Sequence, residues 1–461
     1  MCHTNQIPKA SSSAMRTSSI RASSVGTSRT RSEWSAPHRW GRGDATVRPP
    51  CAVVKGGAPA RRHGAHRWSA RQCRAVPGGR DLAHGGYHPA VAPPGIPFLQ
   101  VRGTHREVGR QIGEALRERI RAGLEREVYA GPFPEGRTLE QQLALASEYL
   151  RVTAEELPWL VEEFEGCAEA AGVDPVALFA WHVEEIWYEP RRPGAPLREE
   201  AALGRCSDLV AVPPATADGH VLVGHNNDLR PEAEEGLVAV EWTVPGEPVV
   251  FTIGGALAAS VGFNSAGISL TGNELAPNDE RVGIPRGPQF RVMLAQRTMD
   301  DVLQVALHPR RASSYNQVLA DRTGRVVNVE GSATDAELTG PDERGHLVHT
   351  NHYVCERMLP YEGDPDYAVR SARRYRRAAE LLGAQPQGTV TEEVLRRILS
   401  DHEGAPDCLC RHPDRFGGES KTVFWCIADV TEGRVTYGRG NPCDSPAQVY
   451  AFAPADLDGL R

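Results

Sequence analysis

The spacing of apolar residues changes once along this chain, close to Cys206, and this change restricts the possible folds more than any other feature. Before Cys206 apolar residues recur every three to four positions, as in the stripe Val108, Ile112 and Leu116, which continues to Leu124. After Cys206 short apolar or alternating runs are separated by turn sequences, a pattern typical of successive β-hairpins. We therefore expect a helical N-terminal part followed by a β-rich C-terminal part.

Local signals delimit the expected helices. Thr104 and Glu107 have the spacing of a capping box at the start of the first helix. Gly172 is typical of a helix end, and Asp174-Pro175 of the next helix start. The spacing predicts helices over 108–124, 139–150, 158–170 and 175–187 and, within the β-rich part, over 290–307, 367–382 and 391–399. The proline-rich, polar stretch 189–203 is predicted to be an exposed linker.

Turn sequences delimit the expected strands. Asp218-Gly219 separates two apolar runs and is a strong hairpin signal, and similar turns occur at 264–267, 321–324 and 432–433. Successive hairpins form antiparallel sheets, and several of these strands are apolar on both faces, so both faces of a sheet should be covered. The pattern favours an α+β fold in which two antiparallel sheets lie between outer helices.

Charge is distributed unevenly along the 461 residues. Residues 1–87 hold fifteen lysines and arginines but three acidic residues, a net charge of about +12, whereas the remainder carries about −19. Because residues 1–87 are rich in serine, arginine and glycine and poor in aliphatic residues, we interpret them as disordered or as an extension before the true start, a transit peptide being the alternative. We expect residues 88–205, mostly helical, and 206–461 to form one domain.

The composition excludes several functions. An acidic body repels phosphate backbones, so we expect no nucleic-acid partner. No apolar run is long enough to span a membrane, so no membrane association is expected. The ten cysteines include no C-x-x-C pair, which favours a reducing compartment and therefore a cytoplasmic location. No cofactor is expected.

The hairpin around Asp218-Gly219 brings two reactive residues together. Its symmetry places Cys206, at the start of one strand, opposite a residue within a few positions of Asp228, at the end of the other. Cleavage between Arg205 and Cys206, at the end of the exposed linker, would free an α-amine with a pKa of about 7.7–8.0 that could take the thiol proton, and Asp228 would hold that amine. The alternative is that Cys206 is a small buried apolar residue.

Segments from about residue 98 to residue 453 resemble, in order, the acyl-coenzyme A:6-aminopenicillanate acyltransferase (isopenicillin N acyltransferase-like) family of autoproteolytic Ntn hydrolases. The matching segments include VRGTHREVG, CSDLVAV, VGHNNDL, VGFNSAGISL, HTNHYV and the GNPC sequence near the end. The resemblance implies a four-layer αββα sandwich. It also implies that Cys206 is the autocatalytic nucleophile and that Asp228 orients its amine.

The resemblance implies roles for three further residues. Asn351 matches the asparagine whose side-chain amide contributes to the oxyanion hole, and Arg374 matches an arginine near the active site, with Arg373 as the second choice in the RRYRR run. His225 stands where the family often has glutamine and is expected at the substrate pocket. The chain departs from the family at Arg205, where glycine is usual, and at Ser207, where threonine is usual.

Two rival interpretations remain open. The first is a zinc-binding protein that uses Cys408, Cys410 and His412, with His402 nearby, but C-x-C-x-H is not the spacing of paired zinc ligands, and we expect no metal. The second is an inactive relative of the same fold that serves as a binding subunit.

We favour a cysteine amidohydrolase or acyltransferase that forms a thioester on Cys206. Its expected partners are a small-molecule amide or acyl donor and a second copy of the chain in a homo-oligomer. The two fragments of the cleaved precursor are also expected to bind each other. N-acyl amino acids, N-acyl amines, β-lactam side-chain amides and short peptides are the candidate substrates.

Overall fold

The computed structural model describes residues 46–48, 95–187 and 205–453 of the 461-residue chain. All of them lie in the compact unit Gly43–Arg461. The prediction for the linker 189–203 falls outside the described residues. So does the prediction for residues 1–87, apart from the strand β1 (Thr46–Arg48).

The first part of the described chain is helical, as the four-residue spacing predicted. Helix α1 (His105–Ala115) begins at the expected capping box, in which Thr104 accepts from the backbone of Glu107. The single helix expected over 108–124 is instead two, because α1 ends at Leu116 and α2 (Arg117–Leu124) starts there. The next helices are α3 (Leu139–Glu156), α4 (Pro158–Ala171) and α5 (Pro175–Trp181). Short helical turns lie at Glu125–Tyr129, Pro134–Gly136 and Glu184–Ile186.

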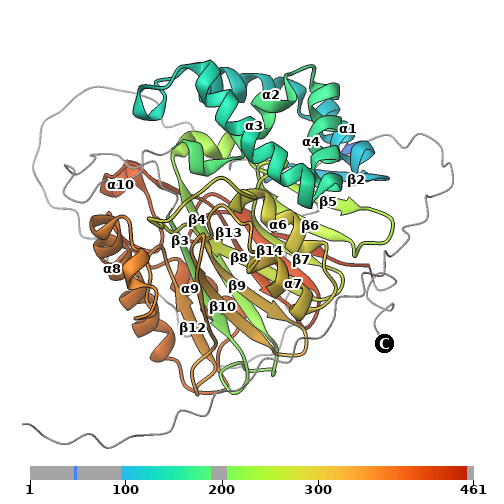
Figure 1. The fold of residues 1–461 in the computed structure, drawn as a ribbon. Helices are drawn as coiled ribbons and strands as arrows, with labels where there is room; N and C mark the ends of the chain where they lie inside the picture. Colours follow the sequence, from blue (N-terminus) through green and yellow to red (C-terminus); the bar gives the residue numbers. More distant parts are fainter. Residues whose placement is uncertain (1–45, 49–94, 188–204, 454–461) are drawn as a thin grey trace, which may run out of the picture. The chain divides into compact units, whose positions relative to one another are not determined.

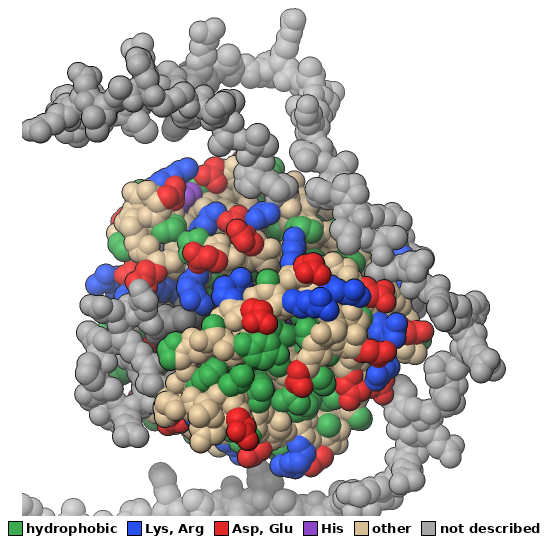
Figure 2. All heavy atoms as spheres, turned by 90° about the horizontal axis from the view of Figure 1, so that it is seen from above, with side chains coloured by type: hydrophobic (Ala, Val, Ile, Leu, Met, Phe, Trp, Pro, Cys, Tyr) green, Lys and Arg blue, Asp and Glu red, His purple; other side chains and the backbone are tan. Residues whose placement is uncertain are grey.

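Helices α1 and α4 pack closely because both carry glycine at the contact. A Cβ atom on Gly109 would lie 2.0 Å from the carbonyl oxygen of Glu163, and one on Gly166 would lie 2.2 Å from that of Arg106. Figure 2 shows acidic and basic side chains interspersed over one face of the molecule, around a region where hydrophobic side chains gather. Ion pairs such as Arg106–Glu169, at 3.0 Å, join α1 to α4 at the surface.

The second part forms two sheets, as expected. The nine-stranded sheet has the order β1-β2-β5-β6-β7-β8-β9-β10-β11, and the six-stranded sheet the order β12-β3-β4-β13-β14-β15. All neighbouring strands are antiparallel except β2 and β5, which are parallel. The first sheet adds to β1 the strands β2 (Phe98–Arg102), β5 (Val238–Thr243), β6 (Val250–Gly254), β7 (Ala259–Asn264), β8 (Ile268–Asn273), β9 (Asn316–Asp321), β10 (Val326–Gly331) and β11 (Ala336–Thr339). The second contains β3 (Arg205–Ala211), β4 (Leu222–Leu229), β12 (His346–His349), β13 (Lys421–Asp429), β14 (Arg434–Arg439) and β15 (Gln448–Ala451).

Helices also interrupt the strands where the sequence predicted them. The stretch expected over 290–307 is two helices, α6 (Arg286–Leu294) and α7 (Met299–Ala306). The other two predictions correspond to α8 (Pro365–Gly383) and α9 (Glu392–Leu399). A short helix, α10 (Pro413–Phe416), precedes β13, and single helical turns lie at Pro231–Gly236 and Leu359–Tyr361.

Three hydrophobic cores separate four layers (Figure 1). One core lies between the nine-stranded sheet and the helices α1 to α7, and it includes Ile112, Phe164 and Leu270. The second lies between the two sheets, where Val210 meets Phe251 and its neighbours. The third covers the other face of the six-stranded sheet with α8 and α9. This αββα sandwich confirms the expected fold class.

The alternation of side chains along β3 decides which layer each residue enters. Val210 belongs to the core between the sheets, whereas Leu209 and Ala211 belong to the core under α8 and α9. Since successive side chains of a strand point to opposite faces, Cys206 points between the sheets, as Val210 does. Among the described residues no helix is long and apolar enough to cross a membrane.

Candidate active site

Cys206 lies at the start of β3, and its pairing confirms the expected hairpin. The register places Cys206 opposite Asn227 and places Arg205 opposite Asp228. The Cys206 side chain is 4 % exposed, and the Nδ2 atom of Asn227 lies 3.7 Å from its Sγ atom. The thiol therefore sits inside the sandwich, one position along from the aspartate at the end of the partner strand.

The surroundings of Cys206 keep its thiol protonated. Burial raises its pKa well above the ordinary value, and the nearby carboxylates of Asp228, Asp208 and Glu274 raise it further. A backbone hydrogen bond from Asp228 acts in the opposite direction. Because the thiolate is the nucleophilic form, a reaction at this sulfur needs a base within reach.

The backbone nitrogen of Cys206 has a side-chain acceptor. Its N–H donates to the Oδ1 atom of Asn351 at 2.7 Å. Asn351 lies two residues after the end of β12. The same oxygen accepts from Arg374 at 2.5 Å, and Arg374 also donates to the carbonyl oxygen of Cys206 at 3.3 Å. The Nδ2 atom of Asn351 donates to the carbonyl oxygen of Glu274 at 3.0 Å. In this uncut chain the amide oxygen of Asn351, not its nitrogen, faces Cys206.

Helix α8 holds Asn351 from two positions one turn apart. The Oγ atom of Ser371 accepts from the backbone N–H of Asn351 at 2.7 Å and lies 2.8 Å from the hydroxyl of Thr350. Arg374 is three residues further along and therefore on the same face of the helix. One helix thus fixes both the backbone and the side chain of Asn351.

Asp228 lies on the other face of its sheet. It is fully buried, accepts from the hydroxyl of Thr422 at 2.6 Å and lies 3.3 Å from the guanidinium of Arg411. Burial raises its pKa, although Arg411 and Arg374 act to lower it. We expected the Asp228 carboxylate to hold the amine of Cys206, but in the uncut chain Asn351 accepts from that nitrogen instead.

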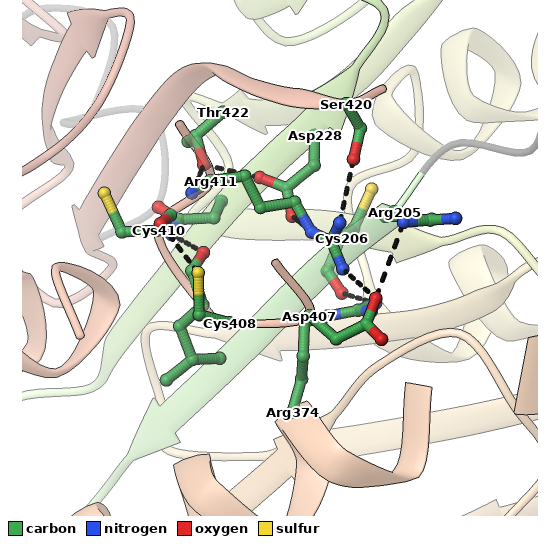
Figure 3. Close-up of polar contacts among 12 residues, drawn as sticks. Arg205, Cys206, Asp228, Arg374, Asp407, Cys408, Cys410, Arg411, Ser420 and Thr422 are labelled. Carbon is green, nitrogen blue, oxygen red and sulfur yellow. Dashed lines mark hydrogen bonds and ion pairs between the residues drawn. The ribbon is translucent and has the colours of Figure 1, made fainter. Parts of the chain in front are cut away.

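Arg205, the residue before the expected cut, lies in a group of buried charges (Figure 3). Its guanidinium lies 3.6 Å from Asp407, and Asp407 also pairs with Arg411 at 3.2 Å. Burial, followed by the charge of Arg411, lowers the pKa of Arg205, and the same two causes lower the pKa of Arg374 to about 10. Three guanidiniums and two carboxylates therefore surround the bond between Arg205 and Cys206.

His225 is on β4, on the same face as Asn227. It is fully buried, and its Nδ1 atom lies 2.7 Å from Asp208, while its Nε2 atom lies 3.5 Å from the amide of Asn227. The chain of contacts runs from Asp208 through His225 and Asn227 to the sulfur of Cys206. Arg373 was the second choice for the arginine near the active site. Its guanidinium is half-exposed and lies 3.6 Å from Asp407.

The sequence reasoning did not identify Asn227, Asp208, Ser371 or Arg411. The first two could have been found from the two-residue period of the hairpin, because residues 206 and 208 share a face and residues 225 and 227 lie opposite them. No signal in the sequence pointed to Arg411, whose partner Asp228 is far away along the chain.

A cavity of about 560 Å³ lies between the helical layer and the sheets. Its lining is largely apolar and includes Ile120, Leu178, Trp181, Leu257 and Phe424. Phe424 is on β13 opposite Asn227, and its ring lies 6.0 Å from that of His225. The cavity thus reaches β13, the strand next to the hairpin that contains Cys206.

The sequence is similar to a known protein family and to a known hydrolase. The sequence model of the family described as acyl-coenzyme A:6-aminopenicillanic acid acyl-transferase matches residues 215–444. A β-alanyl-dopamine/carcinine hydrolase of Drosophila melanogaster is 24 % identical over 393 residues, which cover 76 % of this chain and 94 % of the relative.

Two solved structures show weaker similarity. An N-acylethanolamine-hydrolyzing acid amidase ortholog of Caenorhabditis elegans superposes with a TM-score of 0.36 and 16 % identity over 49 % of this chain and 93 % of its own. The C2A mutant of the conjugated bile acid hydrolase from Clostridium perfringens superposes with a TM-score of 0.35 and 12 % identity over 54 % of this chain and 97 % of its own.

Proposed function

Because the chain belongs to the acyl-coenzyme A:6-aminopenicillanic acid acyl-transferase family, we propose that it is an enzyme which cuts itself before Cys206 and then cleaves amides through a thioester on that residue. The observation that carries the proposal is the hydrogen bond between the Cys206 nitrogen and Asn351, at 2.7 Å, beside a buried and protonated thiol. A base is needed there for turnover, and the free α-amine that cleavage would create on the same residue supplies one.

Self-cleavage proceeds in two steps. The Cys206 sulfur attacks the carbonyl carbon of Arg205, the bond from that carbon to the Cys206 nitrogen breaks, and the thiol proton passes to the nitrogen. Water then hydrolyses the thioester, which leaves a carboxylate on Arg205 and a free thiol and amine on Cys206. Arg374 and Asn351 hold the backbone on both sides of the new terminus.

Turnover uses the new α-amine as the base. Its pKa of about 7.7–8.0 lets it accept the thiol proton near neutral pH, so the thiolate attacks the carbonyl carbon of an amide substrate. The leaving amine takes a proton as the carbon–nitrogen bond breaks, and an acyl thioester remains. Water resolves the thioester in hydrolysis, and a second amine resolves it in acyl transfer.

The roles of the surrounding residues follow from their contacts. Asn351 positions the amine through its Oδ1 atom. The oxyanion role implied by the resemblance requires that its Nδ2 atom leave the carbonyl oxygen of Glu274. Asp228 acts through Arg411 and Thr422 on the far face of the strand. His225 positions Asn227 beside the sulfur.

The two fragments stay together after cleavage in this proposal. Strand β2 pairs with β5 inside the nine-stranded sheet, and the helices before Cys206 share one core with that sheet. The apolar cavity that ends at Phe424 takes the acyl group or the amine of the substrate. The substrate panel should therefore contain N-acyl amino acids, N-acyl amines, β-lactam side-chain amides and short peptides, together with β-alanyl amines, because the Drosophila relative carries that activity in its name.

Intact-mass analysis of the purified chain tests the proposal directly. Two fragments are expected, the second beginning at Cys206, while Cys206→Ala should give one uncut chain without amidase activity. Cys167→Ala is the control for cleavage, since Cys167 is also buried but lies on α4, where it lines the proposed substrate cavity; this variant should still be cut. An uncut wild-type chain that cleaves amides at full rate would disprove the mechanism.

A further inference from the structure

Four metal-ligating side chains converge in the loops beside β13 and β14. His402, Cys410 and His412 lie between α9 and β13, and Cys443 follows β14. One ligand atom of each of the four lies within 4.8 Å of those of the other three. The group is made of two sulfurs and two imidazole nitrogens, a donor set that suits zinc.

The distances within the group agree with tetrahedral coordination. Bonds to zinc of about 2.3 Å from sulfur and about 2.0–2.1 Å from nitrogen imply about 3.8 Å between two sulfurs and about 3.6 Å between sulfur and nitrogen. The Sγ atoms of Cys410 and Cys443 are 3.7 Å apart. The Nε2 atom of His412 lies 3.4 Å from Cys410 and 3.2 Å from Cys443. Each measured distance is within about 0.4 Å of the value that zinc requires.

His402 provides an independent indication of a ligand. Its Nε2 atom is buried and has no hydrogen-bond partner among the described residues. A buried polar atom without a partner costs free energy, so such an atom usually has a partner, which can be a metal. The rings of His402 and His412 lie 5.1 Å apart, and that of Phe416 lies 5.5 Å from His402 and 6.0 Å from His412. Phe416 therefore shields the two histidines on one side.

We propose that His402, Cys410, His412 and Cys443 bind a structural zinc ion. Four protein ligands complete a tetrahedron and leave no position for substrate, which distinguishes a structural site from a catalytic one. Asn441 supports the group from outside, because its Nδ2 atom lies 3.4 Å from the sulfur of Cys410 and donates to the carbonyl oxygen of Arg411 at 2.7 Å.

This ligand set differs from the one considered from the sequence. Cys408 was in that set, but its thiol donates to the carbonyl oxygen of Cys410 at 3.0 Å and is not among the four converging side chains. Cys443, from a separate loop, takes its place. The C-x-C-x-H segment supplies only two of the four ligands, Cys410 and His412. For that reason its spacing does not match that of a zinc motif.

The zinc site also explains how Arg411 is held. Arg411 stands between the ligands Cys410 and His412 and extends away from them, toward Asp228 and Asp407 (Figure 3). It also donates to Ser420 at 2.9 Å. A bound zinc ion on one side of this segment would fix Arg411 on the other, against the buried carboxylate of Asp228. Any effect of this contact between Arg411 and Asp228 on cleavage rests on the proposed function, whereas zinc binding itself does not.

Metal analysis of the full chain tests the site. The protein is purified without a metal-affinity step, and its zinc is measured by mass spectrometry; we expect about one zinc per chain. Cys443→Ser should lower the zinc content about tenfold or more, since Cys443 is exposed and its replacement leaves the core intact. Cys408→Ser is the matched control and should keep its zinc. Chelation with phenanthroline should lower the melting temperature of the wild type more than that of Cys443→Ser.

Three results would overturn the zinc site. They are a wild-type chain that contains no zinc and takes up none from zinc sulfate, full zinc in Cys443→Ser, or a disulfide between Cys410 and Cys443 in the native protein. Cys206→Ala should retain about one zinc whether or not the chain cleaves itself, so failure of the zinc site and failure of the proposed cleavage can be told apart.

Discussion

The backbone N–H of Cys206 donates to the side-chain oxygen of Asn351 at 2.7 Å, although the two residues are 145 positions apart in the sequence. The nitrogen that the proposed cleavage would free thus has its acceptor in the uncut chain already. The same oxygen is held by Arg374 of α8, so the proposed cleavage would require no large rearrangement to position the amine.

Substitutions of Asn351 separate its two possible roles. If its oxygen positions the amine, Asn351→Asp keeps the acceptor and should cleave faster than Asn351→Ala, which we expect to be at least tenfold slower than the wild type. If its nitrogen is the essential oxyanion donor, both variants should lose about 10²–10³ in rate. The rate of fragment appearance after synthesis, followed on denaturing gels, distinguishes the two.

Ser371→Ala should weaken the site without touching the reacting atoms. The substitution leaves the backbone N–H of Asn351 without its acceptor, which we expect to lower the free energy of unfolding by about 1–2 kcal/mol and to slow cleavage. Urea denaturation measures the first effect. Ser147→Ala on the exposed face of α3 is the control, and an equal loss there would contradict the assigned role.

Arg205→Gly should speed self-cleavage. Glycine lets the backbone at the cut adopt strained conformations at lower cost, and the substitution also removes the ion pair with Asp407. Arg205→Ala removes only the side chain and serves as the comparison. Pulse-chase labelling should show the order glycine, alanine, arginine in decreasing rate; a glycine variant slower than the wild type would argue against backbone strain at this bond.

Glu185→Gln should stabilise the protein at alkaline pH. Burial raises the pKa of Glu185 to about 7, so the folded chain retains a proton there that the unfolded chain has lost. Stability contributed by this group is present below the ordinary pKa of about 4.5 and is lost as the pH rises toward 7.

Glutamine keeps the oxygen that accepts from the backbone of Arg286 and carries no charge. The variant should therefore gain about 1–3 kcal/mol over the wild type at pH 8 and little at pH 5. Thermal melts at both pH values measure the difference. Glu155→Gln, at an exposed surface position, should show no such gain, and equal gains at both pH values for Glu185→Gln would refute the assignment.

Much of the fold could be predicted because it depends on local patterns. The capping box at Thr104 and the alternation along β3 act over a few residues, and both appear in the structure where the sequence placed them. The hairpin of β3 and β4 also forms, but residues 212–221, and not Asp218-Gly219 alone, connect its strands. The break between α1 and α2 was missed because the apolar stripe continues through Leu116. The sequence predicted the partner of Cys206 only to within a few positions of Asp228, and the structure shows it to be Asn227.

The sequence by itself determined the succession of helices and hairpins, the position of Cys206 at a strand start and the identity of Asn351 as a site residue by resemblance. Tertiary structure decided which atom of Asn351 faces Cys206, that Ser371 supports it, and that Cys443 joins Cys410 in one group of converging side chains. The physical reason is that periodicity records how a short backbone segment folds, whereas side chains from distant loops meet only after the layers have packed.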